Sequence, residues 1–429
     1  MKIAIIGSGI AGNVVAHHLH RAHDITVFES AGHIGGHTHT HDIELGGERH
    51  AIDTGFIVFN DWTYPNFIAL MNELGVASQP SAMSFSVRNE ISGLEYNGTS
   101  LNSLFAQRLN LLRPSFHHMI REILRFNREA LQLIDSKEEI ALGAYLRNNQ
   151  YTQPFIDNYL IPMGAAIWST DPQRMLSFPA RFFVRFFHNH GMLSEDQRPQ
   201  WRSIRGGSAR YVEKIIAPFK DRIRVNSPVV SLRRMPGHVL VKTLVNTQSA
   251  EAERFDYAFV TCHSDQALAM LADATPVERE VLGAIPYQTN EAVLHTDTSL
   301  LPRKKRAWAA WNYHTGVSGD AATLTYNMNI LQNLRSRHTF CVTLNRTEAI
   351  APGKIIKRLR YEHPLYTPAG VAAQQRQHEV NGADYAGRTF YCGAYWRNDF
   401  HEDGVVSALN ALKHFDEALH AQRHLSRVA

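Results

Sequence analysis

A glycine-rich turn near the N-terminus is the clearest candidate for chemistry in this 429-residue sequence. Gly7, Gly9 and Gly12 form a G-x-G-x-x-G pattern directly after an apolar run and before a helical pattern, which is the context that the motif requires. The first glycine permits a tight turn, the second lets the backbone approach a pyrophosphate, and the third lets the helix lie close to the strand. Ile10 and Ala11 would begin that helix, and their free N–H groups would point toward the phosphates. The pattern predicts a dinucleotide site.

An acidic residue, Glu29, follows the next apolar run, Ile25 to Phe28. Its spacing in sequence from the glycine motif is that of a carboxylate that accepts hydrogen bonds from a ribose 2′-hydroxyl. A carboxylate at this position disfavours the 2′-phosphate of NADP. The same glycine spacing also fits a plain strand-to-helix turn, but strand, helix, strand and acid together favour nucleotide binding.

Further segments carry glycine and acidic patterns suited to a bound cofactor. Ser30 opens a loop that contains Gly35, Gly36, His37 and Thr38. Downstream stand Asp53-Thr54-Gly55, a glycine pair in Ile204 to Ser208, the run Pro228 to Val230, Gly393, and His401-Glu402-Asp403-Gly404-Val405. A glycine before a helix leaves unpaired N–H groups that can meet an electron-rich ligand, although the acidic run could also simply cap its own helix.

In this order the segments resemble the flavoprotein superfamily that includes monoamine oxidases, phytoene desaturases and protoporphyrinogen oxidases. The resemblance implies FAD as the cofactor, with the second glycine pair as a second wall of its site. It also implies that the backbone of Val230 receives the adenine and that the segment from Gly393 to Val405 meets the flavin.

The resemblance further implies an α/β fold of two interleaved domains. A Rossmann-like, amine-oxidase-like FAD-binding domain is expected from residues 1–65, 205–275 and 385–429. A substrate domain of mixed sheet with a helical cap is expected from residues 66–204 and 276–384.

Two positions depart from the amine oxidases. His37 replaces an arginine, so a neutral imidazole would donate to phosphate with less charge. The alternating His37, His39 and His41 could lie on one face of a strand and bind a metal, but no neighbouring carboxylate or cysteine pattern completes such a site. A covalent histidyl flavin is another possibility for these histidines. The strand from Tyr287 to Asp297 lacks the lysine of many amine oxidases, and Asn290 or Glu291 could take its place or face solvent.

Nearly the whole chain resembles a bacterial branch of this superfamily that accompanies cyclopropane-fatty-acid-synthase-like methyltransferases. That association implies a modified fatty acyl chain as substrate and a methyltransferase as partner. We therefore expect an FAD-dependent oxidoreductase that removes a hydride from a hydrophobic molecule, with Glu291, His295 or His401 taking the proton. A flavin amine oxidase that produces hydrogen peroxide and a non-catalytic flavin-binding partner of the methyltransferase are the alternatives.

Two stretches bear on a lipid substrate. Phe178 to His190 interleaves phenylalanines with arginines and histidines, and Leu109 to Arg128 sets apolar residues beside four arginines. Both suit an anionic membrane surface, but the phenylalanines suit a protein core equally well.

Composition narrows the class of protein. A net charge of +4 is too weak to indicate nucleic acid, and the three cysteines lack paired spacing, as expected for reduced thiols in the cytoplasm. The sequence contains no uncharged apolar stretch of the roughly 18 residues that a spanning helix needs. We expect a cytoplasmic protein that at most touches the inner face of the membrane.

The elements that must position these residues are partly visible. Strands are expected at 2–6, 25–28, 223–232, 257–261 and through 287–344, with a hairpin at Pro236 and Gly237. Helices are expected at 11–21, 208–219 and 405–419, and helical character from 65 to 150. The segment 159–201 shows no clean period and is expected to form a cavity wall.

Overall fold

We describe a computed structural model of the chain, in residues 1–136, 140–168, 171–194, 198–245, 248–249, 251–316, 322–382 and 387–428. A five-stranded parallel sheet organises the N-terminal, central and C-terminal segments, and it confirms the predicted Rossmann-like arrangement. Its strands, in spatial order, are β10 (Ile223–Arg224), β2 (Asp24–Phe28), β1 (Lys2–Ile6), β15 (Tyr257–Val260) and β21 (Thr389–Tyr391).

Beyond the first residues of β1 and β2, the strands β1, β2, β15 and β21 are buried and mostly apolar, because both faces of the sheet are covered. Alternate side chains of β1 point to opposite faces, so Ile3 and Ile5 pack against the helical layer while Ala4 and Ile6 pack on the other side. The helical layer consists of α1 (Ile10–Leu19), α2 (Pro65–Glu73), α11 (Ala209–Ile216) and the long α17 (His401–Val428). The opposite face carries an antiparallel sheet of β11 (Val229–Met235), β12 (His238–Val245), β13 (Gln248–Ser249) and β14 (Glu253–Phe255), with α12 (Ser264–Met270) and α13 (Pro276–Gly283).

A seven-stranded sheet forms the second half of the molecule. Its strand order is β20 (Ile355–Pro364), β16 (Tyr287–His295), β19 (Cys341–Leu344), β18 (Thr323–Asn327), β17 (Trp311–Thr315), β7 (Phe85–Asn89) and β8 (Glu95–Asn97). Only β17 and β7 run parallel, because β7 comes from a distant part of the chain. Helix α14 (Met328–Leu331) packs on this sheet, whereas α15 (Pro368–Gln374) and α16 (Gln377–Val380) pack against α13 in the parallel-sheet half.

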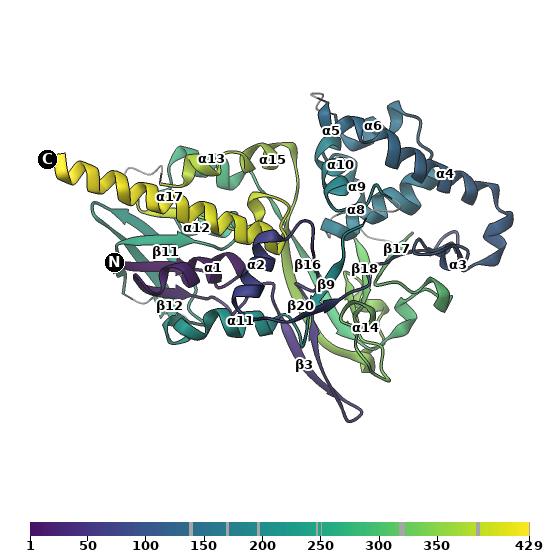
Figure 1. Cartoon of the computed structure of the whole chain (residues 1–429), viewed down its shortest axis with the longest axis horizontal. Helices are drawn as coiled ribbons and strands as arrows, with labels where there is room; N and C mark the ends of the chain where they lie inside the picture. The colour runs from purple at the N-terminus through teal and green to yellow at the C-terminus, as the bar shows by residue number, and fades with distance from the viewer. Residues whose placement is uncertain are drawn as a thin grey trace.

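Small sheets connect the two halves. The hairpin of β3 (Thr40–Leu45) and β4 (Glu48–Asp53) projects from the junction, as Figure 1 shows, and β9 (Trp201–Ile204) pairs with β5 (Phe59–Asn60) and β6 (Ser78–Pro80). The strands β6, β7 and β8 correct the prediction of continuous helix from residue 65, since helical structure resumes only at Leu101.

A helical lobe lies at the end of the molecule opposite both chain termini (Figure 1). It contains α3 (Leu101–Leu104), α4 (Pro114–Glu129), α5 (Gln132–Asp135), α6 (Leu142–Asn148), α7 (Gln153–Phe155), α8 (Ile161–Trp168), α9 (Pro172–Met175) and α10 (Ala180–Asn189). The prediction of no regular element in 159–201 is wrong for α8 and α10. Ala180, Phe183, Val184 and Phe187 bury one face of α10, so its phenylalanines belong to the core and not to a membrane surface.

Candidate functional site

The glycine turn after β1 is built by close contacts that a side chain would block. Gly7 has φ +109°, which favours glycine, and a Cβ at Gly12 would lie 2.1 Å from the carbonyl oxygen of Gly7. A Cβ at Gly9, in contrast, meets no atom within 4 Å. The backbone at the start of α1 is therefore open to a ligand at Gly9 alone among these three glycines.

The carboxylate of Glu29 holds this turn in place. It accepts hydrogen bonds from the Ser8 backbone N–H at 3.0 Å and the Ser8 hydroxyl at 2.6 Å, and from the Ala31 N–H at 2.8 Å. The Ser30 hydroxyl adds a longer bond of 3.3 Å. Glu29 thus links the end of β2 to the glycine turn at the position where the sequence predicts ribose binding.

The second glycine pair packs directly on the first turn. A Cβ at Gly36 would lie 3.1 Å from the Cα of Gly9, and one at Gly55 would lie 2.1 Å from the carbonyl oxygen of His37. The Gly35 N–H donates to the Ser8 hydroxyl at 3.3 Å. Three segments that are distant in sequence therefore form one glycine-lined surface at the carboxyl end of β1.

The start of α17 closes against the same surface. A Cβ at Gly404 would lie 2.6 Å from the Ile10 side chain, so the first turns of α17 and α1 are in contact. Glu402 accepts from the backbone N–H groups of Asn66 and Phe67 at 3.1 and 2.8 Å and so caps α2. Asp403 accepts from Phe400 N–H at 3.0 Å, and burial raises its pKa to about 6.

Asp53 and Thr54 have different surroundings. The buried Asp53 carboxylate accepts from the hydroxyls of Thr40 (2.6 Å) and Ser208 (2.8 Å) and from the Gln332 amide (3.0 Å). Burial raises the pKa of Asp53 to about 6 despite these donors. Asp53 therefore ties the parallel-sheet half to Gln332 of the other half, whereas Thr54 faces the cavity described next.

A cavity of about 150 Å³ lies between the two halves of the molecule. From the parallel-sheet half it is lined by His37, Thr54, Gly55, Phe56, Ile57, Val58, Tyr64, Asn398, Asp399, Phe400 and His401. From the seven-stranded sheet and helical lobe it is lined by Ile167, Trp168, Trp311, Tyr326, Leu344, Tyr361, His363, Pro364 and Tyr366. Trp168 and Trp311 line this cavity, whereas Trp308, Tyr313, Tyr395 and Trp396 do not.

His401 is the one predicted proton acceptor that lines the cavity. Its ring stacks on Phe56 at 3.5 Å between centroids, and its Nε2 lies 2.9 Å from the Thr38 hydroxyl and 3.1 Å from the Tyr211 hydroxyl. Burial lowers the pKa of His401 to about 3, so the ring is neutral at physiological pH. If Nε2 carries the proton and donates to Thr38, Nδ1 is left as the accepting nitrogen.

Two more histidines line the cavity. His363 accepts at Nδ1 from the Asn290 amide at 3.0 Å, which places the proton of the neutral ring on Nε2. Burial lowers the pKa of His363 to about 4. The centroid of the His37 ring lies 5.3 Å from that of His363. Burial lowers the pKa of His37 well below its usual value, and electrostatic repulsion from His363, His263 and His401 lowers it further.

Several polar atoms of the cavity wall have no hydrogen-bond partner among the described residues. They are the indole nitrogens of Trp168 and Trp311 and the hydroxyl of Tyr366, all of them buried. Buried donors of this kind are normally satisfied, so the wall is suited to a polar edge of a bound molecule.

Other predicted residues lie elsewhere. Glu291 accepts from the Thr347 hydroxyl at 2.5 Å, and the buried His295 contacts the Thr343 hydroxyl at 2.7 Å; neither lines the cavity. Val230 is half-exposed at a register shift of β11, and a Cβ at Gly393 would lie 2.4 Å from the Tyr395 ring.

The family model for flavin-containing amine oxidoreductases matches residues 10–337, which is more than half of the sequence. The chain belongs to the flavin-containing amine oxidoreductase family. As a family member it is an FAD-dependent oxidoreductase with the family's FAD-binding fold and a substrate domain.

Solved structures are similar over almost the whole chain. Cyclohexylamine oxidase from Brevibacterium oxydans IH-35A is 15% identical with a TM-score of 0.68, and 98% of this chain and 99% of that chain are covered. Putrescine oxidase bound to putrescine is 12% identical with a TM-score of 0.64, covering 97% and 99%. A CLA-producing fatty acid isomerase from P. acnes is 16% identical with a TM-score of 0.61, covering 96% and 98%. At these identities the likeness establishes the fold alone, and no curated protein matches the sequence.

The residues of this family member fit FAD. The open backbone at Gly9 and the glycine surface around it would hold the pyrophosphate, because N–H groups at the start of α1 face that space. The loop from Gly36 to Thr38, Gly55 and the start of α17 border the cavity where the reactive ring would lie. When bound, FAD would accept a hydride from the substrate.

Three residues that affect the charge of the cavity were not predicted from the sequence. Tyr361 and His363 come from β20, and Asp399 precedes α17 in a left-handed conformation with φ +66°. Asp399 was visible in the C-terminal motif. The two β20 residues reach the cavity through pairing with β16, which no local pattern indicates.

Proposed function

We propose that this FAD-dependent oxidoreductase removes a hydride from a hydrophobic molecule, with a modified fatty acyl chain or phospholipid as its substrate class. One observation carries the proposal: the cavity wall is largely aromatic and aliphatic, and burial shifts the pKa values of its described acid and histidines toward their uncharged forms. Uncharged apolar walls suit an acyl chain, because transferring it from water is favourable and costs no buried charge.

Asp399 is the acid among the described cavity residues, and it supports this reading. Burial, followed by the neighbouring Asp403, raises the pKa of Asp399 well above its usual value, which favours the uncharged form of its carboxyl group. The imidazoles of His37, His363 and His401 are neutral because burial lowers their pKa values. Among the described cavity residues a cationic amine would have only Asp399 to pair with, and burial disfavours the charged form of that acid.

The chemistry divides between the cofactor and the chain. Oxidation of a saturated chain breaks two carbon–hydrogen bonds on adjacent carbons and forms a carbon–carbon double bond. One hydrogen leaves as a hydride, which bound FAD would accept, and the other leaves as a proton, which needs a base. We propose His401 as that base, because its Nε2 is engaged by Thr38 and Tyr211 while Nδ1 remains able to accept. The apolar walls exclude water and orient the chain.

An exposed surface on the helical lobe supports delivery of a membrane lipid. Leu101, Leu109 and Leu112 are 76%, 70% and 82% exposed, and the exposed Arg108 and Arg113 lie between and beside them. Leucines that enter a lipid surface and arginines that meet anionic headgroups are the usual pair for peripheral binding. Among the described helices, none is long and apolar enough to cross a membrane.

A flavin amine oxidase is the second candidate, favoured by the family match and by the fold shared with cyclohexylamine and putrescine oxidases. The fold is shared equally with a fatty acid isomerase, so it does not choose between an amine and an acyl substrate.

Anaerobic addition of candidate substrates to the FAD-bound protein separates the candidates. We expect phospholipids with methylated or cyclopropane acyl chains to abolish the visible absorbance of oxidised flavin, and primary amines to leave it. Reduction by amines, with hydrogen peroxide formed in air, would replace the proposal with the amine oxidase. Tight FAD that neither class reduces would favour a non-catalytic partner of a lipid methyltransferase.

A further inference from the structure

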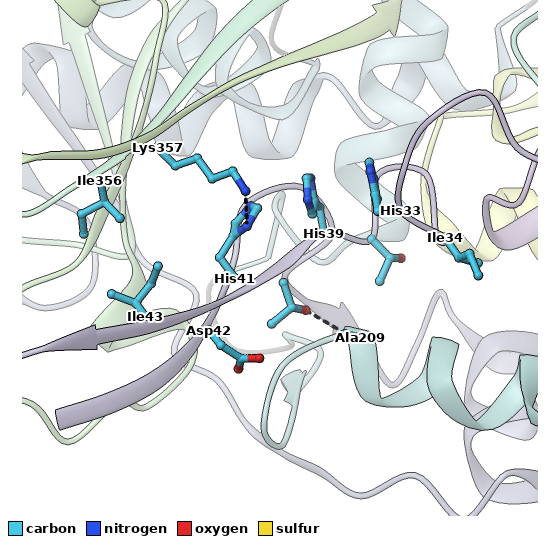
Figure 2. Close-up of a pocket in the computed structure, with 11 residues that line it drawn as sticks. His33, Ile34, His39, His41, Asp42, Ile43, Ala209, Ile356 and Lys357 are labelled. Carbon is cyan, nitrogen blue, oxygen red and sulfur yellow. Dashed lines mark hydrogen bonds between the residues drawn. The ribbon is translucent and has the colours of Figure 1, made fainter. Parts of the chain in front are cut away.

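A second cavity, of about 470 Å³, lies outside the one assigned to the redox reaction. It is bordered by the loop from His33 to Thr38, by β3, by Ala209 at the start of α11, and by Ile356 and Lys357 of β20. Figure 2 shows the rings of His33, His39 and His41 side by side along one wall, with the Lys357 side chain extended toward His41. We call this group the histidine–lysine pocket.

The rings in this pocket are unusually close to one another. His33 and His39 stack with centroids 3.9 Å apart at 9°, and the His39 and His41 centroids are 4.1 Å apart. The Lys357 ammonium donates to His41 Nδ1 at 3.2 Å. Four nitrogen-bearing side chains from three segments therefore converge on one open space.

The charge balance of the pocket is one-sided. Asp42 is the acid among its lining residues, and its carboxylate points away from the three rings in Figure 2. Burial, followed by His33, His41 and Lys357, lowers the pKa of His39 to about 3. Burial, followed by Lys357 and His33, lowers the pKa of His41 to about 4, and only Asp42 opposes this. Protonation is thus disfavoured first by burial and then by mutual repulsion, and a bound anion would relieve the repulsion.

A metal ion fits the pocket poorly. No group of three or more histidine, cysteine, aspartate or glutamate side chains in the described residues is arranged to hold one. The Lys357 ammonium at His41 also occupies a ring nitrogen that a metal would need and would repel a cation.

We propose that the histidine–lysine pocket binds a phosphate-bearing anion. A phosphate group presents several acceptor oxygens to the Lys357 ammonium and to the rings of His33 and His39, and its charge offsets the repulsion among the four side chains. The phosphate could belong to a soluble metabolite or to a lipid headgroup, and the experiment below distinguishes these sources.

The pocket shares a wall with the redox cavity. His41 Nε2 lies 3.1 Å from the Thr54 hydroxyl, which in turn lies 2.8 Å from the Tyr361 hydroxyl. Thr54 and Tyr361 both line the redox cavity. Protonation of His41 on anion binding would therefore reach that cavity through two hydrogen bonds.

Titration calorimetry on the FAD-bound protein tests the proposal, because bound FAD keeps added phosphate out of the dinucleotide site. Inorganic phosphate, glycerol phosphate and acetate are titrated separately, and phosphatidylglycerol vesicles are tested by co-sedimentation. Lys357→Met removes the ammonium. Arg358→Met is the matched control, since Arg358 is the next residue of β20, is also exposed, and faces the opposite side of the strand.

We expect phosphate or its ester to bind and Lys357→Met to weaken binding about tenfold or more, as for loss of a charged hydrogen bond. Arg358→Met should leave the affinity unchanged. Binding should take up protons and tighten as the pH falls from about 8 to about 6, because His39 and His41 become protonated in the complex. Vesicle binding with the same dependence on Lys357, without binding of soluble phosphate, would assign the site to a lipid headgroup.

The proposal is overturned if neither phosphate nor vesicles bind, or if Lys357→Met leaves binding unchanged. Acetate binding as tightly as phosphate would also overturn it in favour of a general carboxylate site. Because the measurement is of binding, failure here would leave the redox proposal standing.

Discussion

Replacing His401 with phenylalanine should change the pH dependence of stability in a direction that the structure fixes. The ring is held neutral in the folded state with a pKa of about 3, whereas an unfolded histidine titrates near 6.5. Between these values the unfolded chain binds more protons, so the contribution of His401 to stability is present at high pH and is lost as the pH falls. At about pH 5, which is about 1.5 pH units below the pKa of the unfolded histidine, the free energy of unfolding is lower by about 2 kcal/mol, because each pH unit costs about 1.36 kcal/mol.

Phenylalanine keeps the stacking on Phe56 but loses the hydrogen bonds of Nε2 to Thr38 and Tyr211. Those two hydroxyls remain paired with each other at 2.6 Å, so the substitution should cost about 1–2 kcal/mol at about pH 8. At about pH 5 the wild-type protein has itself lost about 2 kcal/mol, so the variant should equal or slightly exceed it in stability.

The assay is urea denaturation of the FAD-free protein at the two pH values, so that cofactor affinity does not enter. The exposed His188 of α10 provides a control, since His188→Phe should act equally at both. An equal destabilisation by His401→Phe at the two pH values would refute the assignment of a buried neutral ring. With FAD bound, the same variant should slow flavin reduction by about a hundredfold, as for loss of a general base.

Four further outcomes follow from the described contacts. Gly9→Glu should abolish FAD retention, read from the absorbance of the purified protein, because charge and bulk would enter the space before α1. Asp53→Ala should lower the free energy of unfolding by about 3 kcal/mol or more, measured in urea, since it leaves several buried donors unpaired. The double change of Leu109 and Leu112 to serine should weaken co-sedimentation with anionic vesicles several-fold. Glu291→Gln should alter neither colour nor the rate of flavin reduction by more than about twofold, because Glu291 lies outside the cavity.

The first three of these have a matched control. Gly353→Glu also adds a side chain where no atom lies within 4 Å, but far from the dinucleotide turn, and should retain FAD. Asp221→Ala removes an exposed carboxylate and should be nearly neutral for stability. Val277→Ser removes an exposed apolar side chain on α13 and should leave vesicle binding intact. If a variant and its control behave alike, the role assigned to the substituted residue is wrong.

The sequence predicted the parts of the fold that depend on local signals. The strand at Lys2–Ile6, its glycine turn and α1 were placed to within two residues, because glycine spacing and apolar runs act within a few positions. Helix α10 was missed because the partly buried Phe182 and the buried Phe186 widen its apolar face beyond Phe183 and Phe187 and so hide the helical period. The strands β6 and β7 were missed because they are short and pair with distant segments, and β8 was missed because it is only three residues long and pairs with β7.

The candidate site divides in the same way. The glycine surface was predicted because each segment carries its own motif. Asn290 was noticed on β16, but its partner His363 lies 73 positions away and meets it only through the register of β16 with β20. The alternation of His39 and His41 was likewise visible, whereas Lys357 joins them from β20. Pairings of this range depend on the packed structure and have no local signal.

The most direct test of the central claim is the absorbance spectrum of the purified protein together with mass spectrometry of the cofactor released from it. We expect a yellow protein that releases FAD and loses its visible absorbance when an acyl lipid is added without oxygen. A colourless protein that takes up no FAD would contradict the account at its foundation, and a flavin reduced only by amines would contradict the proposed substrate.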